Sequence, residues 1–164
     1  MFFIFSLFAS TNINAQKLSI KTNLIDIATL SPNLGIDIVL CQHSSISLDA
    51  SINPWSIKSY NFNHLKLSAE YRYWFSETLF KHYIGAGISA GSYKVDAFNQ
   101  NYNEDYVSIG LSYGYSIILN SHWNIEPSIG LGCAYKQNKR IENSSPYFGF
   151  QITRIGFSLI YIIG

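Results

Sequence analysis

The chain has 164 residues, enough for one domain, and carries a formal net charge of +1. Charged residues make up 13% of the chain, well below the roughly 25% usual in soluble domains, whereas aromatic residues make up 16%. The near-neutral charge gives no electrostatic case for binding nucleic acid. After the first residues, no apolar run approaches the roughly 20 residues of a membrane helix. Together these features are typical of a transmembrane β-barrel.

The chain is predicted to begin with a secretory signal peptide at residues 1–15, followed by a barrel domain at residues 16–164. Residues 2–8 are a short apolar core, and Ala15 is a small residue at a possible cleavage position. The alternative is that this apolar segment is a buried first strand.

The clearest strand signal lies between residues 106 and 119. Every second residue from Val107 to Leu119 is apolar or aromatic, and the residues between them are serine or glycine up to Ser116. A period of two places these two sets on opposite faces of a strand. Bulky apolar side chains on one face and minimal ones on the other suit a barrel with lipid outside and a crowded interior.

The same alternation predicts eight strands. In chain order they cover residues 18–24, 34–41, 46–53, 64–75, 84–91, 106–119, 123–135 and 154–163. Eight is the smallest usual number for a membrane barrel. The expected fold class is therefore all-β, an eight-stranded antiparallel up-and-down transmembrane β-barrel with a filled interior.

The connections between these strands alternate in length. Those after the second, fourth and sixth strands are short to moderate, and Ala28 to Pro32 is a short first loop. The longer ones are Pro54–Asn63, Lys94–Asn103 and Lys136–Ser145. Outer-membrane barrels have short periplasmic turns and longer external loops. This pattern predicts a bacterial outer-membrane location with both termini in the periplasm.

Aromatic side chains are predicted to form a belt at the periplasmic boundary, because amphipathic rings prefer membrane interfaces. The belt residues are Tyr71, Tyr73, Phe75, Tyr113, Tyr115, Trp123 and Tyr161. A second group, at the external ends of the strands, contains Tyr93, Tyr106, Tyr135 and Tyr147. The alternative is that aromatic residues simply favour strands.

Eight charged residues fall at inward positions and are predicted to form a structural ion-pair network. They are Lys21, Asp37, Asp49, Lys66, Glu70, Arg72, Glu126 and Arg154. Charges kept from bulk water must be paired and hydrogen-bonded. The strands at 84–91 and 106–119 contribute mainly glycine and serine inside, which leaves room for long side chains. The alternative is that these groups form a proton or ion path.

The sequence assigns no catalytic residue, cofactor or metal. His43, His82 and His122 share the periplasmic rim and could bind a metal, but they lack a short-range ligand spacing and are predicted to be boundary residues. His64, near Ser59 or Ser68, is the one crude candidate for a Ser–His pair.

Two cysteines, Cys41 and Cys133, are predicted to point inward and outward respectively, near opposite ends of their strands. They are expected to be too far apart for a disulfide bond.

Short motifs occur in order through nearly the whole mature chain. They are Lys21–Leu24, Ala28–Gly35, Asn53–Trp55, Glu70–Trp74, Tyr113–Tyr115, Trp123–Glu126 and Gly156–Tyr161. With them the chain resembles a family of small secreted barrels from Bacteroidota, known only as a domain of unknown function. The resemblance implies an outer-membrane β-barrel and no reaction. Relatives often accompany surface fimbrial components, which suggests a partner.

The C-terminal segment Arg154–Tyr161 also resembles the signal read by the barrel-assembly machinery. That resemblance implies the machinery as a partner during biogenesis, besides outer-membrane lipids.

The function expected from the sequence is that of a non-enzymatic outer-membrane barrel. Its role would be structural, or a surface interaction through the external loops with fimbrial or envelope components. One alternative is an outer-membrane enzyme that modifies the acyl chains of lipid A or phospholipids. Another is a soluble barrel that carries an apolar ligand.

Overall fold

The computed structural model describes residues 18–54, 56–57, 60–97, 100–138 and 147–163, and they form nine strands and one short helix. The elements are β1 (Leu18–Asn23), α1 (Leu24–Ala28), β2 (Asn33–Cys41), β3 (Ser44–Asn53), β4 (Ser56–Ile57), β5 (Tyr60–Trp74), β6 (Lys81–Ala97), β7 (Gln100–Ile118), β8 (Trp123–Asn138) and β9 (Tyr147–Ile163). In this part of the chain, no helix has the length and apolar character needed to cross a membrane.

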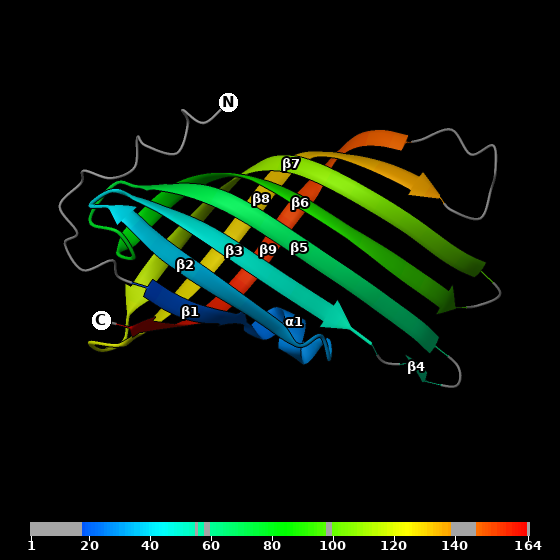
Figure 1. The fold of residues 1–164 in the computed structure, drawn as a ribbon, viewed down its shortest axis with the longest axis horizontal. Coiled ribbons are helices and arrows are strands. Elements are labelled where there is room, and N and C mark those ends of the chain that lie inside the picture. Colours follow the sequence, from blue (N-terminus) through cyan, green and yellow to red (C-terminus); the bar gives the residue numbers. More distant parts are fainter. Residues whose placement is uncertain (1–17, 55, 58–59, 98–99, 139–146, 164) are drawn as a thin grey trace, which may run out of the picture.

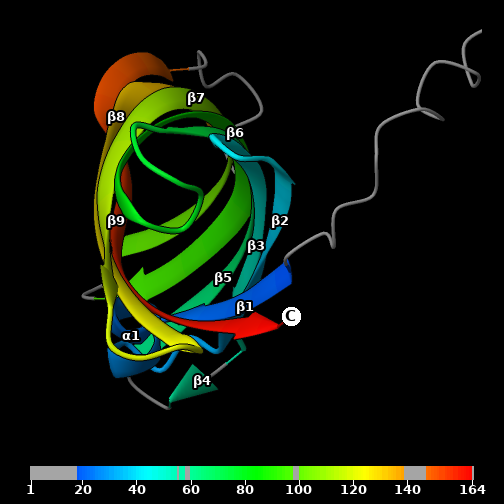
Figure 2. The same ribbon diagram turned by 90° about the vertical axis from the view of Figure 1, so that its left-hand side faces the viewer.

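Eight of the strands close into a ring in which every neighbouring pair is antiparallel. Their order is β3-β2-β1-β9-β8-β7-β6-β5, and β5 pairs back with β3. Figure 2 shows these strands surrounding a lumen, with β9 beside β1. The two-residue strand β4 pairs with β5 alone and adds a ninth strand that the sequence did not predict. The predicted all-β fold of eight antiparallel strands in a ring is confirmed.

The ring has two unlike ends. One end, here called the terminal end, holds the first and last described residues, where Leu18 of β1 pairs with Ile163 of β9. The connections 42–43, 75–80 and 119–122 lie at the same end. At the opposite, far end lie α1, β4 and the hairpin of β6 and β7 (Figure 1). The wall made by β1, β2 and β3 is short, with strands of 6, 9 and 10 residues. The wall made by β5 to β9 has strands of 15 to 19 residues, so it extends further at the far end.

Two of the long connections predicted from the sequence, Pro54–Asn63 and Lys94–Asn103, are largely strand in the described residues. The β6–β7 ladder continues to the pair Ala97–Gln100, inside the predicted loop Lys94–Asn103. Likewise β5 begins at Tyr60 and β8 continues to Asn138. The prediction of a loop at Lys94–Asn103 was wrong because it relied on the polar, asparagine-rich composition of this segment, which main-chain pairing between the two strands outweighs here. Residues 58–59, 98–99 and 139–146 of these connections lie outside the described chain.

The first strand ends earlier than predicted, at Asn23, and α1 follows it. The Asn23 carboxamide oxygen accepts a hydrogen bond from the Ile25 backbone N–H at 3.2 Å, which caps the helix. Leu24, predicted to continue the strand, is the first helical residue. Ile25 and Ile27 are exposed. The short loop predicted at residues 28–32 is therefore only the end of a helical connection.

The two faces of the sheet differ as the alternation predicts. The outer face carries exposed apolar side chains, among them Leu111, which is 70% exposed, and Ile129. The inner face carries buried serines and charged groups, including Arg72 and Glu126, which are 0% and 1% exposed. The ring is thus polar inside and apolar outside, the reverse of a water-soluble barrel.

Candidate functional site in the barrel lumen

An aromatic plug closes the lumen toward the terminal end. It consists of Trp74, Leu79 and Tyr83, all buried. The indole N–H of Trp74 donates to Ser45 Oγ at 3.0 Å, and the Trp74 and Tyr83 rings lie 4.7 Å apart. The sequence predicted Trp74 at an inward position but treated 76–81 as a plain connection, so it missed Leu79. The available signal was the apolar pair Leu79 and Phe80 within a turn whose other residues are polar.

The turn that supplies Leu79 is held inward by a side chain of β8. Asn124 Nδ2 donates to the Leu79 carbonyl at 2.8 Å and to Ser116 Oγ at 3.0 Å. Leu79 itself has a φ of 68°, a left-handed conformation that costs energy in a residue other than glycine. The buried hydrogen bond and the apolar contacts with Trp74 and Tyr83 offset that cost.

Above the plug, the charged side chains form a closed loop of alternating sign. Arg72 Nε is 2.7 Å from Glu70 Oε2, and Arg72 Nη1 is 3.5 Å from Asp37 Oδ1. Lys21 Nζ lies 3.1 Å from Asp37 and 3.0 Å from Asp49.

Arg154 completes the loop. Its two terminal nitrogens lie 2.9 Å from Asp49 Oδ2 and 2.9 Å from Glu70 Oε2. Glu126 is attached to the loop through Arg72 Nη1 at 3.1 Å, and the Tyr83 hydroxyl donates to Glu126 at 3.0 Å. The loop therefore ties together β1, β2, β3, β5, β8 and β9 across the lumen.

Strands β6 and β7 make room for this loop by presenting small residues to the lumen. A Cβ on Gly85 would lie 2.8 Å from the carboxyl carbon of Glu70 and would collide with Ser112 Oγ. The Ser112 hydroxyl instead donates to Glu70. A larger residue at this position would force the Ser112 and Glu70 side chains to move and would disturb the hydrogen bond between them.

Seven of the eight charged residues predicted to face inward belong to this network; Lys66 does not. Within the described residues, Lys66 makes no ion pair. The network joins three cations to four carboxylates. Removing one buried charge by substitution would leave its partner uncompensated, which lowers the free energy of unfolding by about 3–5 kcal/mol.

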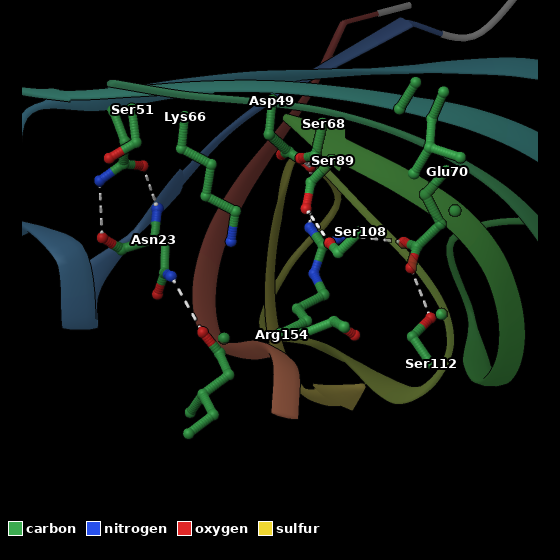
Figure 3. Close-up of a pocket in the computed structure, with 18 of the residues that line it drawn as sticks. Asn23, Asp49, Ser51, Lys66, Ser68, Glu70, Ser89, Ser108, Ser112 and Arg154 are labelled. Atoms are coloured by element: carbon green, nitrogen blue, oxygen red, sulfur yellow. Dashed lines mark hydrogen bonds and ion pairs between the residues drawn. The ribbon is translucent and has the colours of Figure 1, made fainter. Parts of the chain in front are cut away.

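The plug and the ion-pair loop occupy the lumen but leave one space beside them. A cavity of about 70 Å³ lies on the far side of the network. Its polar lining includes Asn23, Asp26, Ser51, Lys66, Ser68, Ser89, Ser108 and Arg154. Figure 3 shows the Lys66 side chain extending into this space, separate from the bonded groups around Arg154 and Glu70.

A Ser–His pair lies beside this cavity, which Ser51 lines, and its serine is not one of those predicted. Ser51 Oγ and His64 Nε2 are 3.3 Å apart. Of the two serines that the sequence suggested, Ser68 donates to Asp49 Oδ2 at 3.3 Å, and Ser59 lies outside the described residues. The pair links two strands, β3 and β5, whose register the sequence could not provide.

Each of the other three histidines makes a hydrogen bond with a different residue. His43 contacts the Ser76 carbonyl, His82 the Tyr113 hydroxyl and His122 the Ser121 hydroxyl. In the described part of the chain, no group of three His, Cys, Asp or Glu residues could hold a metal ion. The three histidines considered as metal ligands are therefore not brought together.

The aromatic residues predicted as the periplasmic belt are placed as follows. Tyr71, Tyr73, Phe75, Tyr113, Trp123 and Tyr161 are exposed on the outer face, and Tyr115 is half-buried. Trp123 and Tyr161 pack with ring centroids 4.9 Å apart. Their role at a membrane boundary stays a prediction.

Both cysteines are free. Cys41, predicted to point inward, is exposed because the β2–β3 pairing shifts register between Val39 and Cys41.

A protein-family model described as "Protein of unknown function (DUF3575)" matches residues 1–163. No curated protein matches the chain. Among solved structures, the crystal structure of Neisserial surface protein A (NspA) is similar, with 14% sequence identity and a TM-score of 0.49. The match covers 89% of this chain and 94% of the neisserial chain.

Proposed function

We propose that this chain, which belongs to the DUF3575 family of proteins of unknown function, is a non-enzymatic outer-membrane β-barrel that contacts a surface partner through its far end. The observation that carries the proposal is the apolar outer face around a charged lumen. An exposed apolar surface of this extent is unfavourable in water and favourable in hydrocarbon. A closed ring of strands satisfies its backbone hydrogen bonds internally, as a membrane-spanning structure must.

The uneven ends of the ring support one orientation. Short turns lie at the terminal end, whereas longer hairpins lie at the far end. Because outer-membrane barrels have short turns in the periplasm, we place both termini there and the far end outside the cell. The partners at this location are outer-membrane lipids, with the barrel-assembly machinery during biogenesis.

The plug and the ion-pair loop support a structural or binding role over transport. Trp74 and Tyr83 close one end of the lumen, and charged side chains cross it. The far end in turn offers the β6–β7 hairpin, which runs past the short wall formed by β1 to β3. We therefore place the contact with a surface protein or envelope component at the far-end connections 54–63, 94–103 and 136–145.

Shortening the β6–β7 hairpin tests this role. Replacing residues 95–102 with Asn-Gly joins Lys94 to Asn103, which are paired in the ladder, through a turn suited to hairpins. We expect the shortened chain to fold, and to lose roughly tenfold or more of the protein crosslinked to it in intact outer membranes.

The matched control is Ser121→Ala in a terminal-end turn, which should leave crosslinking unchanged. Heat-modifiable gel migration reports whether each variant is folded. An undiminished crosslinking pattern after equivalent shortening of all three far-end connections would refute the proposed contact.

A second candidate, a lipid-modifying enzyme, is favoured by the Ser51–His64 pair alone. A histidine at hydrogen-bond distance can activate a serine for acyl transfer. Under the leading proposal, His64→Ala and Ser51→Ala leave the acyl composition of lipid A and phospholipids unchanged by mass spectrometry. Loss of one lipid species in both variants, but not in His122→Ala, would support the enzyme instead. The charged lumen disfavours the third alternative, a soluble carrier of an apolar ligand.

A further inference from the structure

Lys66 is the inward cation that the ion-pair loop leaves out. It lies on β5 between Ser51 of β3 and Gly91 of β6. Its side chain reaches the cavity (Figure 3), and it makes no ion pair within the described residues. A half-buried ammonium group that is in no ion pair is partly desolvated without full compensation, so the cavity favours a ligand with an anionic group.

The polar groups around Lys66 are already bonded to one another. Ser89 and Ser108 hydroxyls are 2.6 Å apart, and Ser68 donates to Asp49. Arg154 is held by Asp49 and Glu70. Among the described residues, Lys66 is therefore the cation in this part of the lumen that no carboxylate already holds in an ion pair.

Asp26 of α1 lines the same cavity and supplies the opposite charge. Like Lys66, it has no ion pair within the described residues. The ion-pair loop already contains more carboxylates than cations, so a simple anion would add to an existing negative excess. A ligand with one negative and one positive group would satisfy Lys66 and Asp26 together and add no net charge.

The cavity extends to the part of the barrel wall where β9 continues beyond the end of β1. β9 pairs with β1 only from Ser158 to Ile163. Beyond that point, in the described chain, β9 has no strand on this side, and Asn23 instead bonds the Ile155 carbonyl at 3.3 Å and the Phe157 N–H at 3.1 Å. Asn23, Asp26 and Ile155 all line the cavity.

The outer surface at this place is apolar. Ile25 and Ile27 of α1 are exposed, as are Ile155 and Phe157 of β9. A polar cavity therefore meets the wall between apolar side chains that would face lipid. This arrangement fits an amphiphile whose headgroup enters the lumen while its acyl chains stay outside against α1 and β9.

We propose that the cavity binds the zwitterionic headgroup of an ethanolamine phospholipid, with its phosphate at Lys66 and its ammonium group at Asp26. The inference rests on the membrane location proposed above and adds a lipid site to it. It is independent of the surface partner at the far end.

The test measures lipid retained by the purified full chain. The barrel is reconstituted in bilayers of equal parts phosphatidylethanolamine, phosphatidylglycerol and phosphatidylcholine, extracted in detergent and examined by native mass spectrometry. We expect one retained lipid, with phosphatidylethanolamine enriched roughly tenfold over the other two. Lys66→Met should remove most of the retained lipid, and Lys66→Arg should restore it.

Asp26→Asn should keep the retained lipid but abolish the preference for phosphatidylethanolamine over phosphatidylglycerol. The matched control is Lys94→Met, at an exposed lysine on β6. A separate arm titrates soluble phosphoethanolamine and inorganic phosphate by ³¹P NMR. Binding of phosphoethanolamine but not of phosphate would support recognition of both charges. Binding of phosphate but not of phosphoethanolamine would refute a site for a zwitterionic headgroup.

The outcomes also separate this inference from the proposed function. Equal lipid retention by the wild type and a folded Lys66→Met variant would refute the headgroup site and leave the membrane location intact. A chain that stays soluble and monomeric without detergent would instead refute the membrane location itself.

Discussion

Replacing Arg72 with methionine is expected to destabilise the barrel by at least about 3–5 kcal/mol, because it removes one partner from several buried ion pairs. Arg72 is 0% exposed and contacts Asp37, Glu70 and Glu126. Its guanidinium also lies 4.5 Å from the centre of the Tyr83 ring. Without it, the negative charge of these carboxylates would be only partly compensated.

The measurement is the urea midpoint for folding in detergent micelles, followed by tryptophan fluorescence, since Trp74 lies in the adjacent plug. Lys81→Met, at an exposed lysine, is the matched control and should keep the wild-type midpoint. Combining Arg72→Met with Glu126→Gln should recover part of the loss, because one unpaired charge is removed with its partner. A wild-type midpoint for Arg72→Met would show that the loop does not stabilise the fold.

Leu111→Arg is the second large expected effect, and it tests which solvent meets the outer face. Leu111 is 70% exposed in the middle of β7. At the middle of a bilayer, arginine on the lipid face costs about 2–4 kcal/mol. On a surface that faces water, the same substitution would stay within about 0.5 kcal/mol.

The two cases are separated by comparing the free energy of unfolding of Leu111→Arg in lipid bilayers with that of Glu77→Arg. Glu77 is exposed in a terminal-end turn, outside the apolar face, and its substitution should have little effect. Equal stability of the two variants would contradict a lipid-facing surface at Leu111 and the proposed location with it.

How far sequence periodicity predicts the fold is clearest in β7 and β9. In β7, one uninterrupted alternation assigns every side chain from Val107 to Ile117 to the correct face. In β9 the exposed residues change from Phe150 and Ile152 to Ile155 and Phe157 because Thr153 is an extra residue between the pairs Leu131–Ile152 and Gly130–Arg154. This bulge turns Arg154 into the lumen.

The candidate site was predictable in its residue types but not in its contacts. Alternation alone placed Lys21, Glu70 and Arg154 at inward positions. It could not tell that these residues join one closed loop while Lys66 stays outside it. Which charges meet across a barrel depends on the stagger of all the strands, and each pair register contributes to that stagger.

The sequence alone determined the faces of the strands, and through them the closed antiparallel ring with charge inside and hydrocarbon-like side chains outside. It could do so because side-chain direction in a strand repeats every two residues and needs only local information. The tertiary structure decided the α1 connection, the inward turn at Leu79, the Ser51–His64 pair and the cavity beside Lys66. These features depend on contacts between segments far apart in the chain, whose distances follow from register and ring closure and not from any local pattern.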